Sequence, residues 1–365
     1  MSALLYYRPR ALLTPESAVL PGMDVFSNYL RLYHIVSPVD TTDTIRMPVR
    51  MKNVFPLPAL RPDPSSYEDV CNERARELLA RSEKLNIPLY VSYSGGIDST
   101  LTLVSLLKFA TASQKKNITV FLSEDSITEN PNFYRDHIRG QLSVRSSLLL
   151  SQFVGENVII VNGELNDQVF GSDIIASLIN LHGPASMHEP YDPEKIITLF
   201  DKSIQQKNIS RSLVHTLERV KNASPVPIET NFDILWWFNF ALKWQSVYFR
   251  SLASVSPKHV HAITQPYLDL HYAPFFATDH FRLWSMNNRD KRIKETWDTY
   301  KWPSKEVIYD YNKDVEYRDH KLKNGSLSKI MWRNEAYNFI DDSLHFHTEL
   351  PLNDYFVPEN DFVTR

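Results

Sequence analysis

The chain of 365 residues is long enough for one large domain or two, each with an ample core. Its composition, 43% hydrophobic and 23% charged, is that of an ordinary globular protein. The net charge of -3 gives no indication of a nucleic-acid surface, although it does not exclude local basic patches. No stretch approaches the roughly 18 apolar residues of a membrane span, and the N-terminal apolar run lacks a signal-peptide cleavage site. The single cysteine, Cys71, excludes an internal disulfide and a cysteine-based metal cluster, so a reducing, cytoplasmic compartment is expected.

Residues 1–66 are predicted to form a short β-rich or irregular N-terminal segment. Aromatic and β-branched runs at 4–7, 29–36 and 45–49 lie there between prolines and a turn. Closely spaced prolines over 56–64 then form a stiff linker, which marks the start of the next structural part.

A helix is predicted over about 67–84, because its apolar residues fall on one side. Ser65 or Ser66 can cap it, with an acidic residue in the first turn. Cys71 lies on this helix, and we expect its thiol to be a core group rather than a nucleophile.

The central feature of the sequence is a strand, a tight glycine turn and a helix start in immediate succession. An apolar run over 87–93 stops at Ser-Gly-Gly-Ile-Asp-Ser, residues 94–99, and a helix with a sheet-packing pattern follows. Such a turn gathers backbone N–H groups and the positive end of the helix dipole, which favours a phosphate or pyrophosphate. The expected phosphate-binding residues are Ser94, Gly95, Gly96, Asp98 and Ser99, with the Asp98 carboxylate able to hold Mg²⁺.

This turn is not a Walker loop, because no Gly-Lys-Ser/Thr closes it, and it lacks the Gly-x-Gly-x-x-Gly pattern of the dinucleotide-binding folds. Residues 94–99 instead resemble the signature loop of the N-type ATP pyrophosphatases. These enzymes cleave ATP between the α and β phosphates, usually to adenylate a substrate. The alternative is that Ser-Gly-Gly is an ordinary strand-to-helix turn.

Two further apolar runs, 118–122 and 158–161, are predicted strands, with a helical segment expected from Tyr134 towards Phe153. Short apolar strands separated by helices favour an α/β fold: a doubly wound, mostly parallel sheet with helices on both faces and a helical C-terminal part. Ligands bind such sheets at the carboxyl ends of the strands. The turns after residues 93, 122 and 161 all lie at such ends, which predicts one shared site.

The turn after residue 161 narrows the resemblance. Its sequence, Gly-Glu-x-x-Asp-x-Val-Phe-Gly over 163–171, is similar to a segment of the asparagine synthetases and to the related turn of the β-lactam synthetases. The resemblance implies that Asp98 and Asp167 hold Mg²⁺ on the ATP phosphates and that Glu164 takes a proton from the attacking amine. Gly163 and, near the adenine, Leu122 and Ser123 complete the expected ATP-binding set. Without the resemblance, Glu164 and Asp167 could be helix-capping acids.

Downstream, residues 182–228 are predicted to be a helical insertion, with helices around 194–207 and 211–223. The aromatic run 234–249 is predicted to be a helix buried against the sheet rather than an aromatic box.

The segment 264–269 is similar to the Arg-Val-Pro-Phe-Leu-Asp of asparagine synthetases, and Asp269 is expected to cap the next helix. Thr264 and Ala262 replace the arginine and glutamate of that family, and Gln168 replaces another glutamate, which puts asparagine synthesis itself in doubt.

The chemistry requires a cation, because negative charge builds on the bridging oxygen as pyrophosphate leaves. Lys291 begins a segment similar to a Lys-x-x-Leu-Arg helix of the family, and Lys313 lies in a turn similar to its Arg-x-Lys. The resemblance, which covers about residues 67–330, implies that these two lysines approach the phosphates. Residues 331–365 are expected to form a tail that packs on this domain.

The expected activity is an ATP- and Mg²⁺-dependent ligase that adenylates a carboxylate and transfers it to an amine. The carboxylate can belong to a small molecule, a peptide or a nucleobase. No glutamine-derived ammonia is expected, because Ser2 stands where the glutaminase domain has its cysteine and the lead-in is too short for that domain. The alternatives are a nucleobase- or tRNA-modifying ATP pyrophosphatase and a non-catalytic nucleotide-binding descendant. The sequence does not indicate an oligomeric state.

Overall fold

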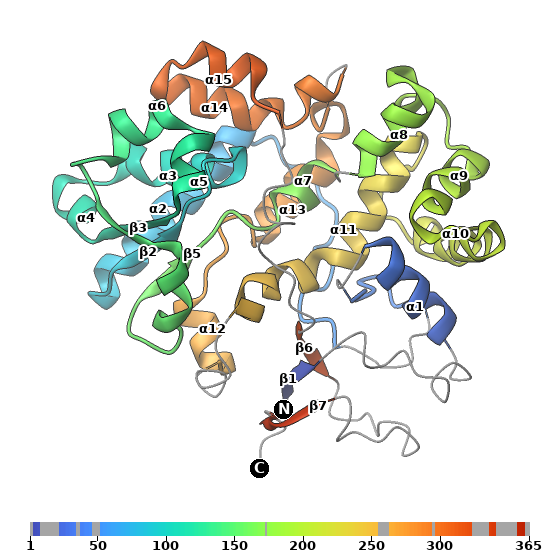
Figure 1. Ribbon diagram of the computed structural model, residues 1–365, viewed down its shortest axis with the longest axis horizontal. Coiled ribbons are helices and arrows are strands. Elements are labelled where there is room, and N and C mark those ends of the chain that lie inside the picture. The colour runs from blue at the N-terminus through green and yellow to red at the C-terminus, as the bar shows by residue number, and fades with distance from the viewer. Residues whose placement is uncertain are drawn as a thin grey trace. The chain divides into compact units, whose positions relative to one another are not determined.

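The computed structural model describes residues 3–7, 22–33, 37–45, 52–171, 174–254, 263–293, 296–322, 336–340 and 356–361. It divides into two compact units (Figure 1). The first consists of Met1–Ala59, Gly171–Ser254 and Met331–Arg365, and the second of Leu60–Phe170 and Val255–Ile330. Every residue that the sequence assigns to the nucleotide site belongs to the second unit.

The second unit is built on a four-stranded, all-parallel sheet in the order β4-β3-β2-β5. The strands are β2 (Leu89–Ser92), β3 (Ile118–Leu122), β4 (Ser143–Ser146) and β5 (Ile159–Val161). Leu89 of β2 lies opposite both Ile118 and Ile159, and β2, β3 and β5 end at nearly the same level. The predicted α/β fold with a parallel sheet is confirmed, as is the helical C-terminal part.

Local sequence explains the elements that lead to the site. Helix α2 (Tyr67–Leu85) starts with a capping box between Ser66 and Asp69, as predicted. Cys71 on this helix is buried, and burial raises the pKa of its thiol, which suits a core residue. Helix α3 (Ile97–Phe109) follows β2 and is buried along most of its length.

Helices from the C-terminal part close around α2 and α3. They are α12 (Gln265–His271), α13 (Asp279–Asn287), α14 (Trp302–Asn312) and α15 (Val315–His320). Helix α14 packs on both α2 and α3, and α13 packs on α2 and on α7 (Asn166–Phe170). The Tyr67 ring contacts the rings of Phe170 and Trp284, with centroids 4.9 and 4.6 Å away.

The first unit is mainly helical. It contains α1 (Met23–Leu32), α8 (Ile174–His182), α9 (Pro193–Ile204), α10 (Lys207–Asn222) and α11 (Asn231–Arg250). An antiparallel sheet of β6 (Ala336–Ile340), β1 (Ala3–Tyr7) and β7 (Phe356–Asp361) belongs to the same unit. The two predicted helices of the insertion correspond to α9 and α10.

Three predicted elements need correction. The segment 134–153 is not one helix, because a π-helical turn, Tyr134–Ile138, is followed by strand β4 and a 3-10 helix, Ser147–Phe153. Strand β4 is short, polar and exposed at the edge of the sheet, so it lacks the apolar pattern that reveals a strand. Residues 29–32 of the run 29–36 are helical rather than β-strand, because they belong to α1. The buried face of this helix includes Val25, Phe26 and Tyr29. Residues 34–36 and 46–50 lie outside the described part.

The aromatic run 234–249 is a helix, α11, but its neighbours are α8, α10 and β6 of the first unit. The helix is buried, as predicted, and its coverage by the parallel sheet stays a prediction, because that sheet belongs to the other unit. Asp269 does not cap the following helix, because it lies inside α12 and accepts a hydrogen bond from Gln265 Nε2 at 2.7 Å. Thr278 is the residue that precedes α13.

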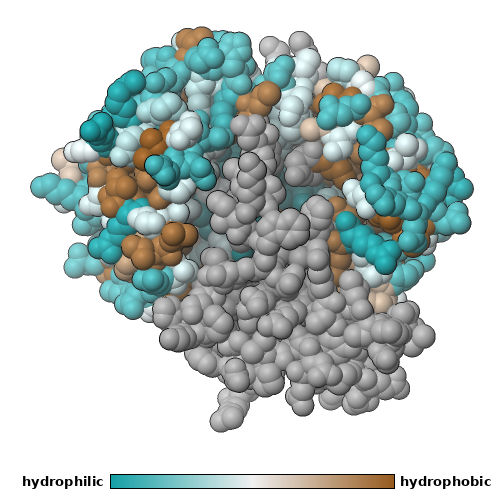
Figure 2. Space-filling model, viewed as in Figure 1, coloured by the Kyte–Doolittle hydropathy of each residue, from teal (hydrophilic) through white to brown (hydrophobic). Residues whose placement is uncertain are grey.

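The visible surface of the described residues is largely hydrophilic with scattered apolar patches (Figure 2). Exposed large hydrophobic side chains include Val144 on β4 and Leu148 in the 3-10 helix after it. In the described ranges, no helix is both long and apolar enough to cross a membrane.

Candidate functional site

The turn between β2 and α3 leaves the start of a 13-residue helix without a side-chain cap. Gly96 is the N-cap residue of α3, and no side chain accepts a hydrogen bond from the first N–H groups. Those groups, together with the positive end of the helix dipole, could hold an anion. The geometry agrees with the phosphate-binding role predicted for residues 94–99.

Two serines shape this turn from within. Ser99 Oγ accepts a hydrogen bond from the Ser94 N–H at 3.0 Å, and the two hydroxyl oxygens are also 3.0 Å apart. Ser99 Oγ in turn donates to the carbonyl oxygen of Gly96 at 3.2 Å. Ser99 is buried and Ser94 is half-buried, so Ser94 is the more accessible hydroxyl.

The two glycines have different reasons to be there. Gly95 has a φ of 76°, and a Cβ on it would lie 2.4 Å from the Ser126 carbonyl oxygen and 2.7 Å from Glu129 Cβ. The helix that follows β3, Glu124–Glu129, therefore packs on the Gly95 backbone. Both the positive φ and this close packing require glycine. A Cβ on Gly96 would meet nothing closer than 3.4 Å, so its neighbours leave the backbone accessible to a ligand.

The end of β3 supplies the residues predicted near the adenine. Leu122 is buried, and Ser123 caps the helix α5 (Glu124–Glu129) through a reciprocal pair of hydrogen bonds with Ser126. Ser123 thus has a local structural role, and its proximity to the 94–99 turn follows from the Ser126–Gly95 contact.

The turn after β5 touches the start of α3 directly. A Cβ on Gly163 would lie 2.8 Å from the Asp98 carbonyl carbon and 2.9 Å from the Ser99 nitrogen, both of which are backbone atoms. Two residues later, Leu165 is buried with a φ of 81°, a conformation that is strained for a leucine. This close and strained turn carries Asp167 towards Asp98.

Asp98 and Asp167 converge on one ammonium group, that of Lys301. Lys301 Nζ lies 2.6 Å from Asp98 Oδ1 and 2.7 Å from Asp167 Oδ1. The two carboxylate oxygens are therefore at most about 5.3 Å apart, the sum of those distances. The lysine side chain is 1% exposed, whereas those of Asp98 and Asp167 are 26% and 24% exposed. The predicted convergence of the strand ends is confirmed, with a cation between the carboxylates.

A buried polar cluster stands behind Asp98. Asn166 Nδ2 donates to Asp98 Oδ1 at 2.6 Å and to Ser304 Oγ at 3.3 Å, while the Tyr67 hydroxyl donates to Asn166 Oδ1 at 2.5 Å. Burial raises the pKa of Tyr67 well above its ordinary value, so its hydroxyl stays protonated. The cluster fixes the orientation of one carboxylate oxygen and leaves the other side of Asp98 accessible.

Aromatic side chains of the C-terminal part complete the surroundings. The Tyr300 hydroxyl donates to Asp167 Oδ1 at 3.3 Å, and the half-buried Trp297 ring stacks on Tyr300 with centroids 4.6 Å apart. Tyr317 on α15 donates to the Gly95 carbonyl oxygen at 3.1 Å. Helix α15 therefore holds the glycine turn in place.

The structure does not bring Lys291 or Lys313 into this cluster. Lys291 Nζ donates to Asn288 Oδ1, and Lys313 forms an exposed pair with Asp310 at the far end of α14. Lys313 is roughly 18 Å from Lys301 along the helix axis, at about 1.5 Å per residue. Glu164 is half-buried in the same turn as Asp167, and its N–H donates to Asn162 Oδ1.

Sequence reasoning missed Lys301. It is the N-cap residue of α14, with Pro303 in the first turn of that helix and a φ of 58°. A lysine there is disfavoured by the positive end of the helix dipole. The sequence signal for Lys301 is a lysine directly before Trp302-Pro303, which begin a helix. A cation at a helix N-terminus needs acidic side chains nearby to offset the helix dipole.

The donor set fits one Mg²⁺ shared with phosphate oxygens. Mg²⁺ in nucleotide sites is bound by one or two carboxylates, with ligand oxygens at about 2.1 Å and thus at most about 4.2 Å from each other. The separation of the Asp98 and Asp167 oxygens, at most about 5.3 Å, exceeds that limit by no more than about 1 Å. The Lys301 ammonium between them shows that the position accommodates a positive charge. Within the described residues, no group of three or more protein ligands is placed to hold a metal without a substrate.

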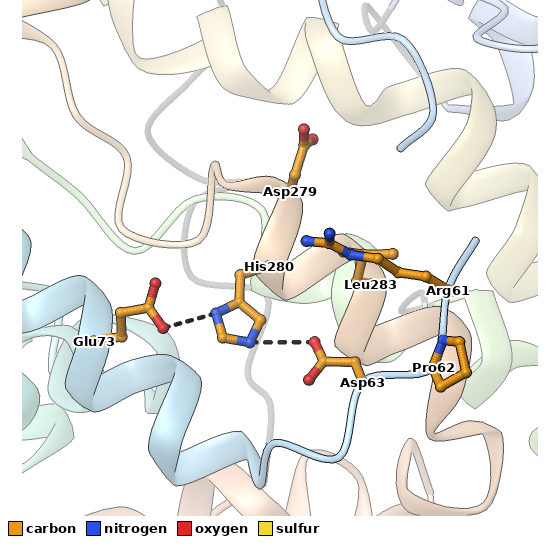
Figure 3. A pocket seen from close by; sticks show the side chains of 7 residues that line it. All are labelled: Arg61, Pro62, Asp63, Glu73, Asp279, His280 and Leu283. Carbon is orange, nitrogen blue, oxygen red and sulfur yellow. Dashed lines mark ion pairs between the residues drawn. The ribbon is translucent and has the colours of Figure 1, made fainter. Parts of the chain in front are cut away.

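A surface depression of about 480 Å³ lies elsewhere on the second unit and is centred on His280 (Figure 3). His280 Nε2 is 3.2 Å from Asp63 Oδ2, and its Nδ1 is 3.1 Å from Glu73 Oε2. The residues lining it include none of those assigned to the nucleotide. These contacts join Asp63, in the proline-rich linker 56–64, to His280 on α13 and to Glu73 on α2.

Replacing Gly163 should destabilise the fold where a similar change at Gly96 does not. Gly163→Ala forces a Cβ against two backbone atoms that cannot give way, so we expect a loss of about 1–3 kcal/mol in the free energy of unfolding. Gly96→Ala has room and a φ of -73°, so it should change stability by less than about 0.5 kcal/mol. Urea unfolding followed by tryptophan fluorescence measures both, and equal losses would contradict the role given to Gly163.

The Asp63 carboxylate should stabilise the fold in a pH-dependent way. Burial raises its pKa, but hydrogen bonds from Ser65 and the charge of His280 outweigh burial, and the pKa is lowered. Its contribution is therefore complete above the unfolded-state pKa of about 3.9 and is lost as the pH falls through the lower folded value. Asp63→Asn should cost about 1 kcal/mol at pH 7 and little below about pH 3.

Glu73→Gln removes the other, 70% exposed partner of His280 and serves as the matched control. It should change stability by less than about 0.5 kcal/mol. Urea unfolding between pH 3 and 7 checks both variants, and a pH-independent loss for Asp63→Asn would count against the ion pair.

Comparison of the sequence with models of protein families and with curated proteins finds no match to either. The resemblance to the ATP pyrophosphatases thus stays a resemblance in two short turns and a weaker downstream pattern. The geometry of these turns is what supports a function.

Proposed function

We propose that this protein is an ATP-dependent, AMP-forming ligase that joins a carboxylate to an amine. The observation that carries the proposal is the convergence of Asp98 and Asp167, from the ends of two parallel strands, beside the uncapped N-terminus of α3. A helix N-terminus attracts phosphate, and paired carboxylates attract Mg²⁺. Together they suit the triphosphate of ATP.

In the proposed reaction a substrate carboxylate oxygen bonds to the α-phosphorus, and the bond from that phosphorus to the bridging oxygen breaks to release pyrophosphate. The N–H groups at the start of α3 and the Ser94 hydroxyl bind phosphate oxygens. Lys301 supplies the cation that balances charge on the departing pyrophosphate. Mg²⁺ held by Asp98 and Asp167 would neutralise and orient the phosphates.

An amine nitrogen then bonds to the acyl carbon, and AMP leaves with the electrons of the carbon–oxygen bond. Glu164, half-buried next to the Asp167 turn, accepts the proton that the amine loses. The same residues would promote adenylation of any carboxylate, so the substrate is chosen by groups outside this cluster.

A second candidate is a nucleobase-modifying ATP pyrophosphatase, which uses the same loop to activate a carbonyl oxygen. The Trp297–Tyr300 stack favours it, because an aromatic surface next to Asp167 suits a planar ring. Co-purification of nucleic acid, or activity on an oligonucleotide and none on the carboxylate pool, would select this candidate.

Loss of the Asp98 carboxylate should abolish pyrophosphate–ATP exchange. With Mg²⁺ and the small-molecule fraction of a cell extract as the carboxylate source, Asp98→Asn should lower exchange of labelled pyrophosphate at least 100-fold. Asp310→Asn, an exposed carboxylate on α14, is the matched control and should stay within twofold. No exchange in the wild-type protein, with ATP bound but intact, would indicate a non-catalytic nucleotide-binding protein.

The same assay separates the candidate lysines. Lys301→Met should reduce exchange by about 10²–10³-fold, because it removes the buried cation of the cluster. Lys313→Met should reduce it by less than threefold, because Lys313 pairs on an exposed surface. The reverse ranking would restore the assignment that the sequence resemblance implies.

A further inference from the structure

We propose that the Lys301 ammonium and the Mg²⁺ of the nucleotide take turns between Asp98 and Asp167. The lysine occupies the carboxylate pair when no nucleotide is bound, and it moves to the phosphates when ATP brings the metal. This inference rests on the proposed function. It makes divalent-metal binding depend on the nucleotide.

The distances exclude simultaneous occupancy. Lys301 Nζ is 2.6 Å from both Asp98 carboxylate oxygens and 2.7 Å from Asp167 Oδ1. A Mg²⁺ bound to one oxygen of each carboxylate would lie about 2.1 Å from each and would share the space of the ammonium. Two cations that close repel strongly in a partly buried site. The metal therefore enters only if the lysine leaves.

Charge explains why the exchange requires a nucleotide. Two carboxylates and one ammonium carry a formal charge of minus one, whereas the same carboxylates with Mg²⁺ carry none. The displaced ammonium needs a new anionic partner, because a buried unpaired charge costs several kcal/mol. A triphosphate at the α3 N-terminus supplies that partner, and free metal does not.

The backbone around Lys301 suits a side chain that moves. Lys301 precedes α14 rather than lying inside it, and its φ of 58° places it in the left-handed region. Its present position opposes the α14 dipole, and the two carboxylates offset that cost. The next lysine on this helix, Lys305, donates to the Asp298 carbonyl oxygen at 2.8 Å, so it is held by a different partner.

Metal binding without nucleotide tests the exchange. Mn²⁺ is titrated into the full-length protein and followed by electron paramagnetic resonance, with no ATP present. Lys301→Met should bind Mn²⁺ at least tenfold more tightly than wild type, because the competing cation is gone. Lys116→Met removes a charge from the exposed end of α4 (Ala112–Lys116) and should leave the affinity unchanged.

A second Lys301 variant controls for unfolding, and a double variant shows where the metal binds. Lys301→Gly removes the ammonium and adopts the positive φ without strain, so it retains the α14 start if Lys301→Met unfolds. Adding Asp98→Asn to either should return Mn²⁺ affinity to the wild-type level, which locates the gained site. Equal affinities in wild type and the Lys301 variants would overturn the exchange.

The outcome is separable from that of the proposed function. A gain in Mn²⁺ affinity with no pyrophosphate exchange in wild type supports the cation exchange and argues against the ligase. Pyrophosphate exchange in wild type with no gain in Mn²⁺ affinity supports the ligase and rejects the alternation of Lys301 with metal.

Discussion

The shared ammonium of Lys301 is the interaction on which the site depends. It joins the turn after β2, the turn after β5 and the start of α14, which contribute residues as far as 203 positions apart in the sequence. An ammonium that is 1% exposed needs both good geometry and acidic partners, because desolvating it is expensive. The positions of the two turns and of α14 are therefore mutually dependent.

The turns after β2 and β5 are also held in place by contacts that do not involve Lys301. Gly163 allows the β5 turn to lie on the α3 backbone, and Asn166, Ser304 and Tyr67 fix Asp98 from behind. Tyr317 holds Gly95 from the C-terminal side. These contacts hold the backbone and the two carboxylates in place, so under the proposed exchange only the Lys301 side chain has to move.

The sequence predicts the parts of the fold that local patterns determine. Strands β2, β3 and β5 follow from apolar runs, and α2 follows from a capping signal. The convergence of Asp98 with Asp167 follows from the rule that parallel strands end at one edge. Strand β4 escaped prediction because its exposed Ser-Val-Arg-Ser sequence has no strand pattern, and its pairing with β3 is non-local. The neighbours of α11 within its own unit could not be predicted either, because the aromatic pattern of a helix does not specify which elements pack on it.

Motif spacing places Lys313 near the phosphates, whereas in the structure Lys301 is the lysine beside Asp98, because spacing counts residues along the chain and approach to Asp98 depends on where α14 packs. Helix α14 lies on α2 and α3, so its N-terminal end faces the carboxylates and its C-terminal end does not. Lys301 and Lys313 share the same left-handed backbone at opposite ends of this helix, yet only the first is buried. The two lysines differ in burial, and burial cannot be inferred from the resemblance of sequence motifs.

The backbone is strained at several positions around the two carboxylates. Positive φ angles occur at Gly95, Leu165 and Lys301, each within or next to the turns that meet at the carboxylates. For leucine and lysine this conformation costs of order 1 kcal/mol or more, and it persists only where the surroundings impose it. A structural ion pair needs neither the strain nor a second carboxylate. The three charged groups leave a net negative charge that is partly exposed beside the N-terminus of α3, and the proposed binding of a metal together with an anion requires this combination.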